Sequence, residues 1–227
     1  MKVKVEKKIL TANEEFAEKN RSIFEKNKML CLNMISSPGS GKTAILVRTI
    51  KQLKRKLAIG VIEGDIQTDL DARRISSTHA PVIQINTKGG CHLSAEQVNL
   101  ALKKLPLSKL GCIVIENVGN LVCPSVFELG ENAKIAVLSV AEGDEKVIKY
   151  PEIFVRAKAL LINKIDLFDA GAAINFSIKK AEKYVRSLNR HIEIFPVSAL
   201  TGDGFKEWCA WLLEESKKRT FCTTGQI

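Results

Sequence analysis

One segment of the chain, from Ser36 to Thr43, has the residue types needed to hold phosphate groups. It follows an apolar run directly and precedes a helical stretch. Glycines let backbone N–H groups fold around phosphate oxygens, and the N-terminus of the next helix adds a favourable dipole. Lys42 can place its charge on the terminal phosphates, and the Thr43 hydroxyl can bind Mg²⁺. The residues predicted to bind a nucleoside triphosphate are Ser37, Pro38, Gly39, Ser40, Gly41, Lys42 and Thr43.

This segment departs in one place from the usual pattern G-x-x-x-x-G-K-[ST], because Ser36 stands where the first glycine is expected. A serine fits there if the backbone φ angle is negative, since it is positive φ angles that strongly favour glycine. We also expect the side chain of Lys42 to face solvent until a phosphate arrives. A glycine-rich strand–helix turn with a chance Lys-Thr pair is the alternative interpretation.

A second segment, 163–166 (Asn-Lys-Ile-Asp), can select the base of the nucleotide. It follows the apolar run 159–162, at the carboxyl end of a predicted strand, where ligands bind in open α/β sheets. The Asp166 carboxylate can accept two hydrogen bonds, and guanine presents two adjacent donors whereas adenine does not. Ser198 and Ala199 follow the last apolar run and are similar to a loop whose backbone N–H binds guanine O6. The residues predicted to contact guanine are Asn163, Lys164, Asp166, Ser198 and Ala199.

Carboxylates at the ends of two more apolar runs can bind a metal ion near the phosphates. The segment 63–71 follows one run, and the segment 116–120 follows another. Carboxylates in such positions can hold Mg²⁺, directly or through water, and orient the attacking water. Each can equally be an exposed loop carboxylate or a helix N-cap. We predict catalytic roles for Lys42, Asp65 and Glu116, and magnesium coordination by Thr43, Asp65, Asp71 and Glu116.

A separate group of residues has side chains that bind soft or borderline cations. Cys91 and His92 are adjacent and follow two glycines, so both can reach one ion. Cys123 lies just after the second acidic segment, and it joins them if both segments meet at one edge of the sheet. Three ligands leave a tetrahedral site incomplete, so water or a second subunit would complete it. The alternative is packing cysteines beside a surface histidine; Cys31 and Cys112, inside apolar runs, are expected in the core.

The elements that must position these residues are visible as seven short apolar runs alternating with longer amphipathic segments. Nearly continuous apolar strands separated by helices are typical of a parallel sheet covered on both faces. We predict an α/β fold: a single P-loop NTPase domain with a doubly wound, mostly parallel sheet of about seven strands and helices on both faces. The predicted parts are an N-terminal amphipathic helical extension (1–28), the P-loop domain with an inserted metal-binding loop (29–219) and a polar tail (220–227). The apolar runs are Leu30–Ile35, Leu57–Ile62, Val82–Ile85, Cys112–Ile115, Ile135–Val140, Ala159–Ile162 and Ile192–Val197.

The composition limits the classes of protein to which the chain can belong. It has 227 residues, 45% of them hydrophobic and 26% charged, which is ordinary for a globular protein. No apolar run approaches the roughly 18 residues that span a bilayer, the start lacks a signal-peptide pattern and the cysteines are sparse, so we expect a cytoplasmic protein without a membrane partner. The net charge is +10, but its carriers are scattered over separate predicted helices. We expect solvated helix faces and no nucleic-acid binding, with a surface for phosphates or an acidic partner as the alternative.

The motifs together resemble the HypB family, the nickel-inserting GTPases of NiFe-hydrogenase maturation. The resemblance covers nearly the whole chain from Lys8 onwards, and its most specific part is the run Glu-Asn-Val-Gly-Asn-Leu-Val-Cys-Pro at 116–124. The other matching segments are 36–43, 61–68, 91–93, 139–151 and 163–166.

The resemblance implies a dimerising GTPase of the SIMIBI class, related to the signal-recognition GTPases. GTP would be hydrolysed slowly to GDP, with Mg²⁺, at or near the interface of a homodimer, and Lys146 would make a contact across that interface. Nickel or zinc would bind Cys91, His92 and Cys123. The nickel would pass to the precursor of the NiFe-hydrogenase large subunit with the help of a small zinc-bearing partner of the HypA type.

The chain lacks two features of some family members, an N-terminal Cys-x-x-Cys-Gly-Cys motif and a histidine-rich stretch. The resemblance therefore supports only the nucleotide-linked metal site. Two other interpretations stay open. A urease-accessory nickel GTPase shares the P-loop and a Gly-Gly-Cys segment but typically has Cys-Pro-His, whereas Cys91 and His92 are adjacent here. A signalling or RNA-associated GTPase would use its cysteines only for packing.

Overall fold

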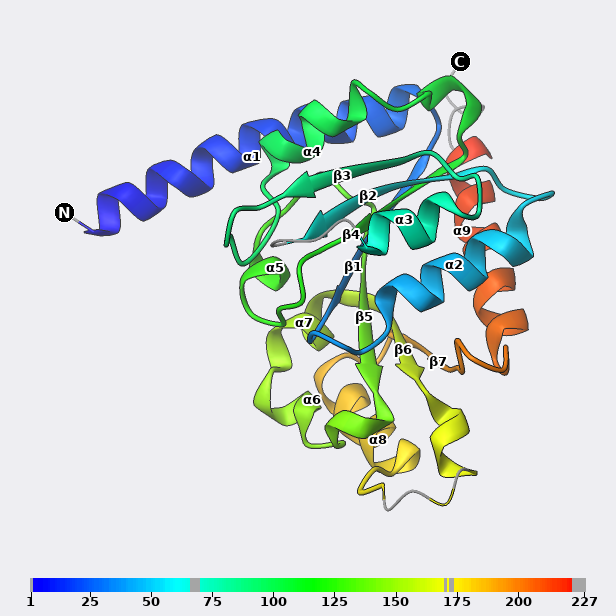
Figure 1. The fold of residues 1–227 in the computed structure, drawn as a ribbon. Coiled ribbons are helices and arrows are strands. Elements are labelled where there is room, and N and C mark those ends of the chain that lie inside the picture. Colours follow the sequence, from blue (N-terminus) through cyan, green and yellow to red (C-terminus); the bar gives the residue numbers. More distant parts are fainter. Residues whose placement is uncertain (1, 66–69, 170, 172–173, 222–227) are drawn as a thin grey trace.

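The computed structural model describes residues 2–65, 70–169, 171 and 174–221 of the chain. Seven strands form one sheet in the order β3-β2-β4-β1-β5-β6-β7 (Figure 1), and every pair of neighbours is parallel. The predicted doubly wound α/β sheet is confirmed, and within the described ranges it is parallel throughout. The strands are β1 (Leu30–Ser36), β2 (Ile59–Asp65), β3 (Val82–Asn86), β4 (Cys112–Glu116), β5 (Ala133–Ser139), β6 (Ala157–Asn163) and β7 (Glu193–Pro196).

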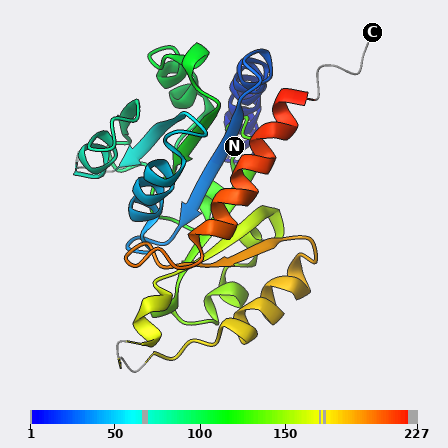
Figure 2. The ribbon, with the colours of Figure 1, turned by 90° about the vertical axis from the view of Figure 1, so that its right-hand side faces the viewer.

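Helices lie on both sides of this sheet (Figure 2). The α-helices are α1 (Lys2–Lys26), α2 (Lys42–Leu53), α3 (Leu70–Ser76), α4 (Ala95–Leu102), α5 (Cys123–Val126), α6 (Lys146–Lys149), α7 (Pro151–Arg156), α8 (Ile178–Leu188) and α9 (Phe205–Phe221). Short 3₁₀ helices are formed by Leu107–Lys109, Val140–Glu142 and Ile165–Phe168.

The two faces of the sheet contribute side chains to separate apolar clusters, because successive side chains of a strand point in opposite directions. On one face, strand residues such as Leu32 and Val114 pack against α2, α3 and α9. On the other face, the alternate residues of the same strands, such as Cys31 and Ile113, pack against α1 and α4. Further along that second face, the strands pack against α7 and α8. The near-continuous apolar character of the strands is therefore explained by burial on both sides.

Four strands end on residues that the sequence analysis singled out. Strand β1 ends at Ser36, β2 at Asp65, β4 at Glu116 and β6 at Asn163. Because all the strands run in one direction, these four ends meet at a single edge of the sheet, and a ligand can bind in the crevice beyond it.

The N-terminal helix α1 is part of the packed domain. It lies alongside α4 (Figure 1), and its Ala17 and Phe24 are fully buried. The predicted division at residue 28 therefore separates no independent unit. At the other end, α9 runs to Phe221, past the predicted start of the tail at residue 220, and residues 222–227 lie outside the described part of the chain. Among the helices described, none is both long enough and apolar enough to cross a membrane.

Candidate functional site

The predicted phosphate loop joins β1 to α2 at the sheet edge. Gly41 caps α2 with φ at 95°, and a Cβ atom there would lie 2.5 Å from Nδ2 of Asn163, so only glycine fits. Ser36 is the last residue of β1 and is not among the described residues with positive φ. The expectation that a serine is tolerated at this position is therefore confirmed.

The expectation that the Lys42 side chain faces solvent is wrong, because the residue is buried, with 8% exposure. Its Nζ donates a hydrogen bond of 2.9 Å to the hydroxyl of Ser36, the serine that replaces the glycine of the usual pattern. Burial lowers the pKa of Lys42, while nearby carboxylates, Glu116 first among them, oppose that shift. The lysine is thus held inside the loop at the place where phosphate oxygens would arrive.

The predicted guanine-binding residues lie against the same loop. The Asn163 side chain donates to the Ser40 carbonyl at 2.9 Å, and Lys164 Nζ donates to the Gly39 carbonyl at 2.7 Å. The Ser198 hydroxyl donates to the Asp166 carboxylate. The structure therefore brings the predicted base-binding segment into contact with the phosphate loop, although about 120 residues separate the two in the sequence. One bound nucleotide can reach both segments.

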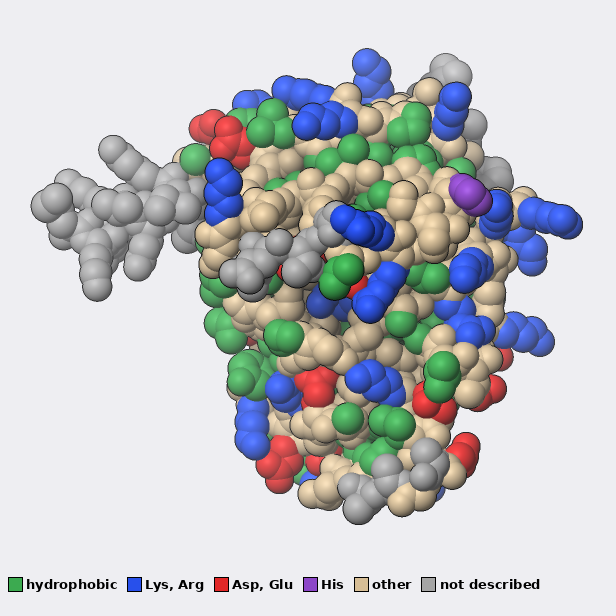
Figure 3. All heavy atoms as spheres, viewed as in Figure 1, with side chains coloured by type: hydrophobic (Ala, Val, Ile, Leu, Met, Phe, Trp, Pro, Cys, Tyr) green, Lys and Arg blue, Asp and Glu red, His purple; other side chains and the backbone are tan. Residues whose placement is uncertain are grey.

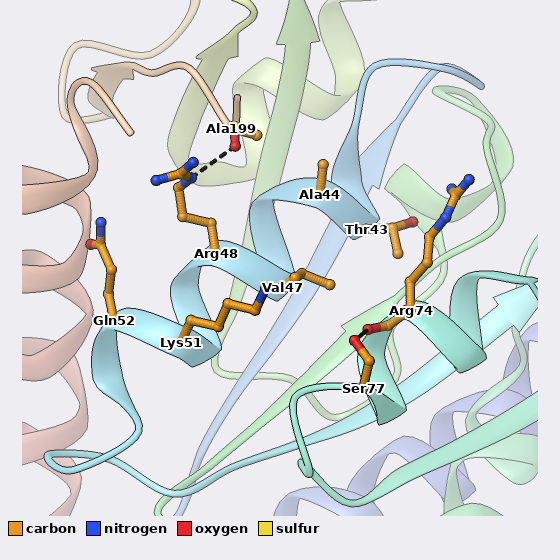
Figure 4. Close-up of a pocket in the computed structure, with 9 residues that line it drawn as sticks. All are labelled: Thr43, Ala44, Val47, Arg48, Lys51, Gln52, Arg74, Ser77 and Ala199. Carbon is orange, nitrogen blue, oxygen red and sulfur yellow. Dashed lines mark hydrogen bonds between the residues drawn. The ribbon is translucent and has the colours of Figure 1, made fainter. Parts of the chain in front are cut away.

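Two features of this base region were not foreseen. The backbone N–H of Ala199, in the loop expected to supply an N–H to guanine O6, donates to Asn163 Oδ1 at 3.1 Å. Arg48 on α2 donates to the carbonyls of Ala199 and Leu200 at 2.8 and 2.6 Å, and so ties the base loop to the phosphate-binding helix (Figure 4). A pocket of about 570 Å³ lies between α2, α3 and this loop. An arginine within a charged helix gives no sequence signal for such a role.

A cavity of about 450 Å³ lies beside the phosphate loop and is lined by the predicted carboxylates Asp65, Asp71 and Glu116. Carboxylate oxygens of Glu63, Asp65 and Asp71 lie within 4.8 Å of one another. Thr43 Oγ1 donates to Glu116 Oε1 at 2.8 Å, while the buried Oε2 atoms of Glu63 and Glu116 have no hydrogen-bond partner among the described residues. Oxygen ligands clustered in this way fit Mg²⁺. Residues 66–69, between Asp65 and α3, lie outside the described ranges.

Glu63 is a candidate ligand that the sequence analysis did not select. It lies within β2, opposite Glu116 on β4, and its position inside a strand hid it among core residues. Desolvation raises its pKa to about 8, with Glu116 and Asp65 adding to the shift. Desolvation also raises the pKa of Glu116 to about 7, although Lys42 and the Thr43 hydrogen bond lower it.

These two carboxyl groups are expected to make the nucleotide-free, magnesium-free protein less stable as the pH rises. Their pKa values in the folded chain, about 8 for Glu63 and about 7 for Glu116, lie above the ordinary 4.5. Between pH 4.5 and these raised values, the folded state therefore binds more protons than the unfolded state. The free energy of unfolding then falls with rising pH, and the stability present below 4.5 is lost as the pH passes the two folded values. Thermal melts in a chelator, across this pH range, measure the loss, and Glu63→Gln should flatten it. A melting temperature that climbs through the same range would contradict the assignment.

The three predicted soft-metal ligands converge. One ligand atom each of Cys91, His92 and Cys123 lies within 4.8 Å of the others, and Cys91 Sγ is 3.4 Å from His92 Nδ1. The His92 ring stacks on Phe127 at 3.9 Å, just beyond α5, which begins at Cys123. Burial lowers the pKa of His92, which favours the neutral imidazole that binds metals. Two thiols and a neutral imidazole fit nickel or zinc.

Two asparagines connect this metal cluster to the nucleotide cavity. Asn117, which follows the buried Glu116, accepts a hydrogen bond from the Leu93 backbone N–H at 3.1 Å. Asn120 donates to the carbonyl of Cys91 at 3.2 Å. The segment at the end of β4 therefore holds the loop that carries two of the ligands, and it also leads directly to the third.

The predicted contact residue Lys146 lies at the start of α6. Its Nζ is 3.5 Å from the carboxylate of Glu142, which in turn accepts a 2.5 Å hydrogen bond from the Ser40 hydroxyl. Lys146 is therefore one side chain away from the phosphate loop of its own chain, and its contact across an interface stays a prediction. On the face drawn in Figure 3, the visible Lys and Arg side chains are spread over several elements and do not gather in one patch.

Known proteins resemble the chain in sequence and in fold. The family model described as "CobW/HypB/UreG, nucleotide-binding domain" matches residues 31–196. The hydrogenase maturation factor HypB of Escherichia coli (strain K12) is 48% identical over 210 residues, which are 92% of this chain and 71% of that protein. The hydrogenase/urease maturation factor HypB of Helicobacter pylori is 36% identical over 220 residues, 95% of this chain and 89% of that protein. The crystal structure of HypB from Helicobacter pylori in complex with nickel has a TM-score of 0.86 at 34% identity and covers 95% of this chain and 100% of that chain.

Proposed function

The chain belongs to the HypB hydrogenase maturation factors of the CobW/HypB/UreG family, and on this premise we propose that it is a GTP-hydrolysing metallochaperone. It binds nickel, or zinc, and delivers nickel during the maturation of NiFe-hydrogenase. The observation that supports this best is the junction of two sites. The loop that carries Cys91 and His92 is hydrogen-bonded, at the Leu93 N–H and the Cys91 carbonyl, to Asn117 and Asn120 of the segment that borders the nucleotide cavity. Cys123, the third member of the cluster, follows that segment.

In the proposed reaction, the residues of the sheet edge hold GTP and direct its hydrolysis to GDP and phosphate. Lys42 contacts the terminal phosphates, and Asp166 with the Ser198–Ala199 loop holds guanine. Thr43, Asp65, Asp71 and Glu116 hold Mg²⁺, which neutralises charge on the phosphates when it is bound. Asp65 and Glu116 orient the attacking water. Turnover is slow, well below the roughly 10 s⁻¹ median of enzymes, because a nucleotide switch gains nothing from rapid GTP hydrolysis that is not coupled to metal delivery.

The proposed partners follow from the family. Two copies of the chain form a homodimer on GTP or metal binding, and Lys146 contacts the nucleotide across the interface. The nickel passes from the metal site to the precursor of the hydrogenase large subunit, with the help of a zinc-bearing nickel chaperone of the HypA type. These steps take place in the cytoplasm, and neither a membrane nor a nucleic acid takes part.

A urease-accessory function is the second candidate, because the Helicobacter pylori relative is named as a hydrogenase/urease factor. The test is rescue of hydrogenase and urease activities separately in cells that lack their own maturation proteins. Hydrogenase rescue supports the main proposal, and urease rescue alone overturns it. Failure of the purified chain to bind nickel or zinc would instead favour a signalling or RNA-associated GTPase.

Replacing Cys123 with alanine is expected to weaken nickel binding and to abolish its dependence on the nucleotide. Cys123 follows the segment that responds to the γ-phosphate, and a metal–thiolate bond tolerates displacements of only a few tenths of an ångström. In the absence of metal, GTP affinity should be nearly unchanged, because the phosphate loop is intact. Nickel titrations with and without a GTP analogue measure both effects.

The matched control is Cys209→Ala, since Cys209 lies on α9 and bonds to Gln52, away from the metal cluster. It should keep nickel affinity and nucleotide dependence. A Cys123→Ala protein that retains both properties would remove Cys123 from the metal site.

A further inference from the structure

The helix α1 makes side-chain hydrogen bonds to both segments that carry the metal ligands. Asn13 accepts from the Ala95 N–H at 2.9 Å and donates to the Glu128 carbonyl at 2.7 Å. Asn20 donates to the carbonyls of Ala95 and Leu129 at 2.8 and 2.9 Å. Each asparagine thus bridges the same two pieces of backbone, which come from different parts of the chain.

The bridged backbone positions stand close to the ligands along the chain. Ala95 is the first residue of α4 and is three residues beyond His92. Glu128 directly follows Phe127, whose ring stacks on His92, and the same stretch begins at Cys123. The asparagines therefore set the separation between the loop of Cys91 and His92 and the segment of Cys123.

The packing around these bonds leaves little room for adjustment. Asn20 is fully buried, Asn13 is 9% exposed, and Asn99 of α4 donates to Asn20 Oδ1 at 2.9 Å. Gly130, with φ at 88°, lies directly against α1: a Cβ atom there would be 2.8 Å from Cβ of Asn20 and would also collide with the Ala17 carbonyl. Buried side chains whose polar groups are fully bonded hold one geometry, because any shift leaves a polar group unsatisfied.

We propose that Asn13 and Asn20 are positioning residues for the metal cluster, so that α1 is an outer support of the metal site. This inference rests on the proposed metal-binding function. Groups that hydrogen-bond the metal ligands directly commonly contribute 10- to 100-fold in metal affinity. Asn13 and Asn20 bond the backbone beside the ligands, one step further out, so their effect should lie at the lower end of that range. The helix lies outside residues 31–196, the part that matches the nucleotide-binding family model. Among the described residues, the side chains of Asn13 and Asn20 form no hydrogen bond with the phosphate loop or the base loop.

The first test is nickel affinity of Asn13→Ala and Asn20→Ala, read from thiolate-to-nickel absorption during titration with Ni²⁺ alone. We expect the dissociation constant to rise about 10-fold, the lower end of the range for direct partners of metal ligands, while GDP affinity stays within about twofold of the parent protein because the nucleotide site is untouched. The matched control is Asn27→Ala, since Asn27 directly follows the same helix and, among the described residues, its side chain bonds only to the Ile23 carbonyl of that helix. If Asn20→Ala fails to fold, the less buried Asn13→Ala decides.

The second test needs no metal. Cys222 lies outside the described residues, so it is replaced with serine to leave one thiol fewer to react. A short bifunctional thiol reagent such as dibromobimane then links Cys91 to Cys123, and the rate of crosslinking reports the separation of the two thiols. The rate should fall in Asn13→Ala, in Asn20→Ala and in Gly130→Ala, and it should stay unchanged in Asn27→Ala.

The outcomes distinguish a failure of the proposed metal-binding function from a failure of the proposed support by α1. Parent protein that binds no nickel overturns the proposed function, while the crosslinking rate still tests the support by α1. Unchanged nickel affinity and crosslinking in both asparagine variants overturns the inference. It is also overturned if GDP affinity falls as much as nickel affinity, because a general loss of folding would then explain both.

Discussion

Replacing Lys42 with alanine is expected to eliminate measurable GTP binding or hydrolysis while the protein stays folded. Lys42 supplies the positive charge at the place where the terminal phosphates bind. Its ammonium group is buried and bonded to a neutral hydroxyl, and burial lowers its pKa. Removing a cation that is costly to bury leaves the nucleotide-free fold intact, so its melting temperature should be unchanged or higher.

The measurement is binding of a fluorescent GTP analogue with Mg²⁺, beside single-turnover hydrolysis and a thermal melt. The matched control is Lys54→Ala, an exposed lysine at the C-terminal end of α2, which should bind and hydrolyse GTP like the parent protein. A Lys42→Ala protein that hydrolyses GTP at the parent rate would contradict the assignment of this loop.

Replacing Asp166 with asparagine is expected to lower GTP affinity by about 2–4 kcal/mol, which is roughly 30- to 1000-fold. Two guanine donors then face an amide that offers one acceptor, and the amide N–H₂ is set against a guanine donor. The asparagine Oδ1 can still accept from Ser198, as Asp166 does in the structure, so the loop should keep its shape. Xanthosine triphosphate, which presents an acceptor where guanine has N2–H₂, should gain affinity.

Competition binding with GTP and xanthosine triphosphate measures this reversal. The matched control is Asp203→Asn, because Asp203 belongs to the same loop and, within the described part of the chain, its carboxylate bonds only to Thr201. Equal GTP affinities for Asp166→Asn and the parent protein would end the guanine assignment.

The fold and the broad layout of the site were predictable because they depend on local order in the sequence. An all-parallel sheet places every strand end at one edge. Ser36, Asp65, Glu116 and Asn163 are strand-terminal residues, so the apolar runs before them already fixed their common location. The convergence of Cys91 with Cys123 followed in the same way, since each comes after a strand end on neighbouring parts of that edge.

What the sequence missed depends on contacts between distant segments. Nothing local shows that Lys42 turns inward to Ser36, that Arg48 reaches Ala199, or that a carboxylate inside β2 faces the cavity. The sequence predicted helix α1 as an extension, because an amphipathic pattern indicates that one face of a helix is buried but not which element packs against that face. Its asparagines resemble ordinary polar helix residues until the backbone of the metal segments is placed against them.

The central claim is that one chain links a guanine-nucleotide site to a nickel site, and the most direct measurement is nickel affinity of the unmodified protein in three states. These are no nucleotide, GDP with Mg²⁺, and a non-hydrolysable GTP analogue with Mg²⁺. The hydrogen bonds from Asn117 and Asn120 to the loop of Cys91 predict affinities that differ by about 5- to 150-fold between nucleotide states, for a coupling of about 1–3 kcal/mol. By linkage, nickel must shift nucleotide affinity by the same factor. Identical nickel affinities in all three states would contradict the account and leave the cysteines with a structural role.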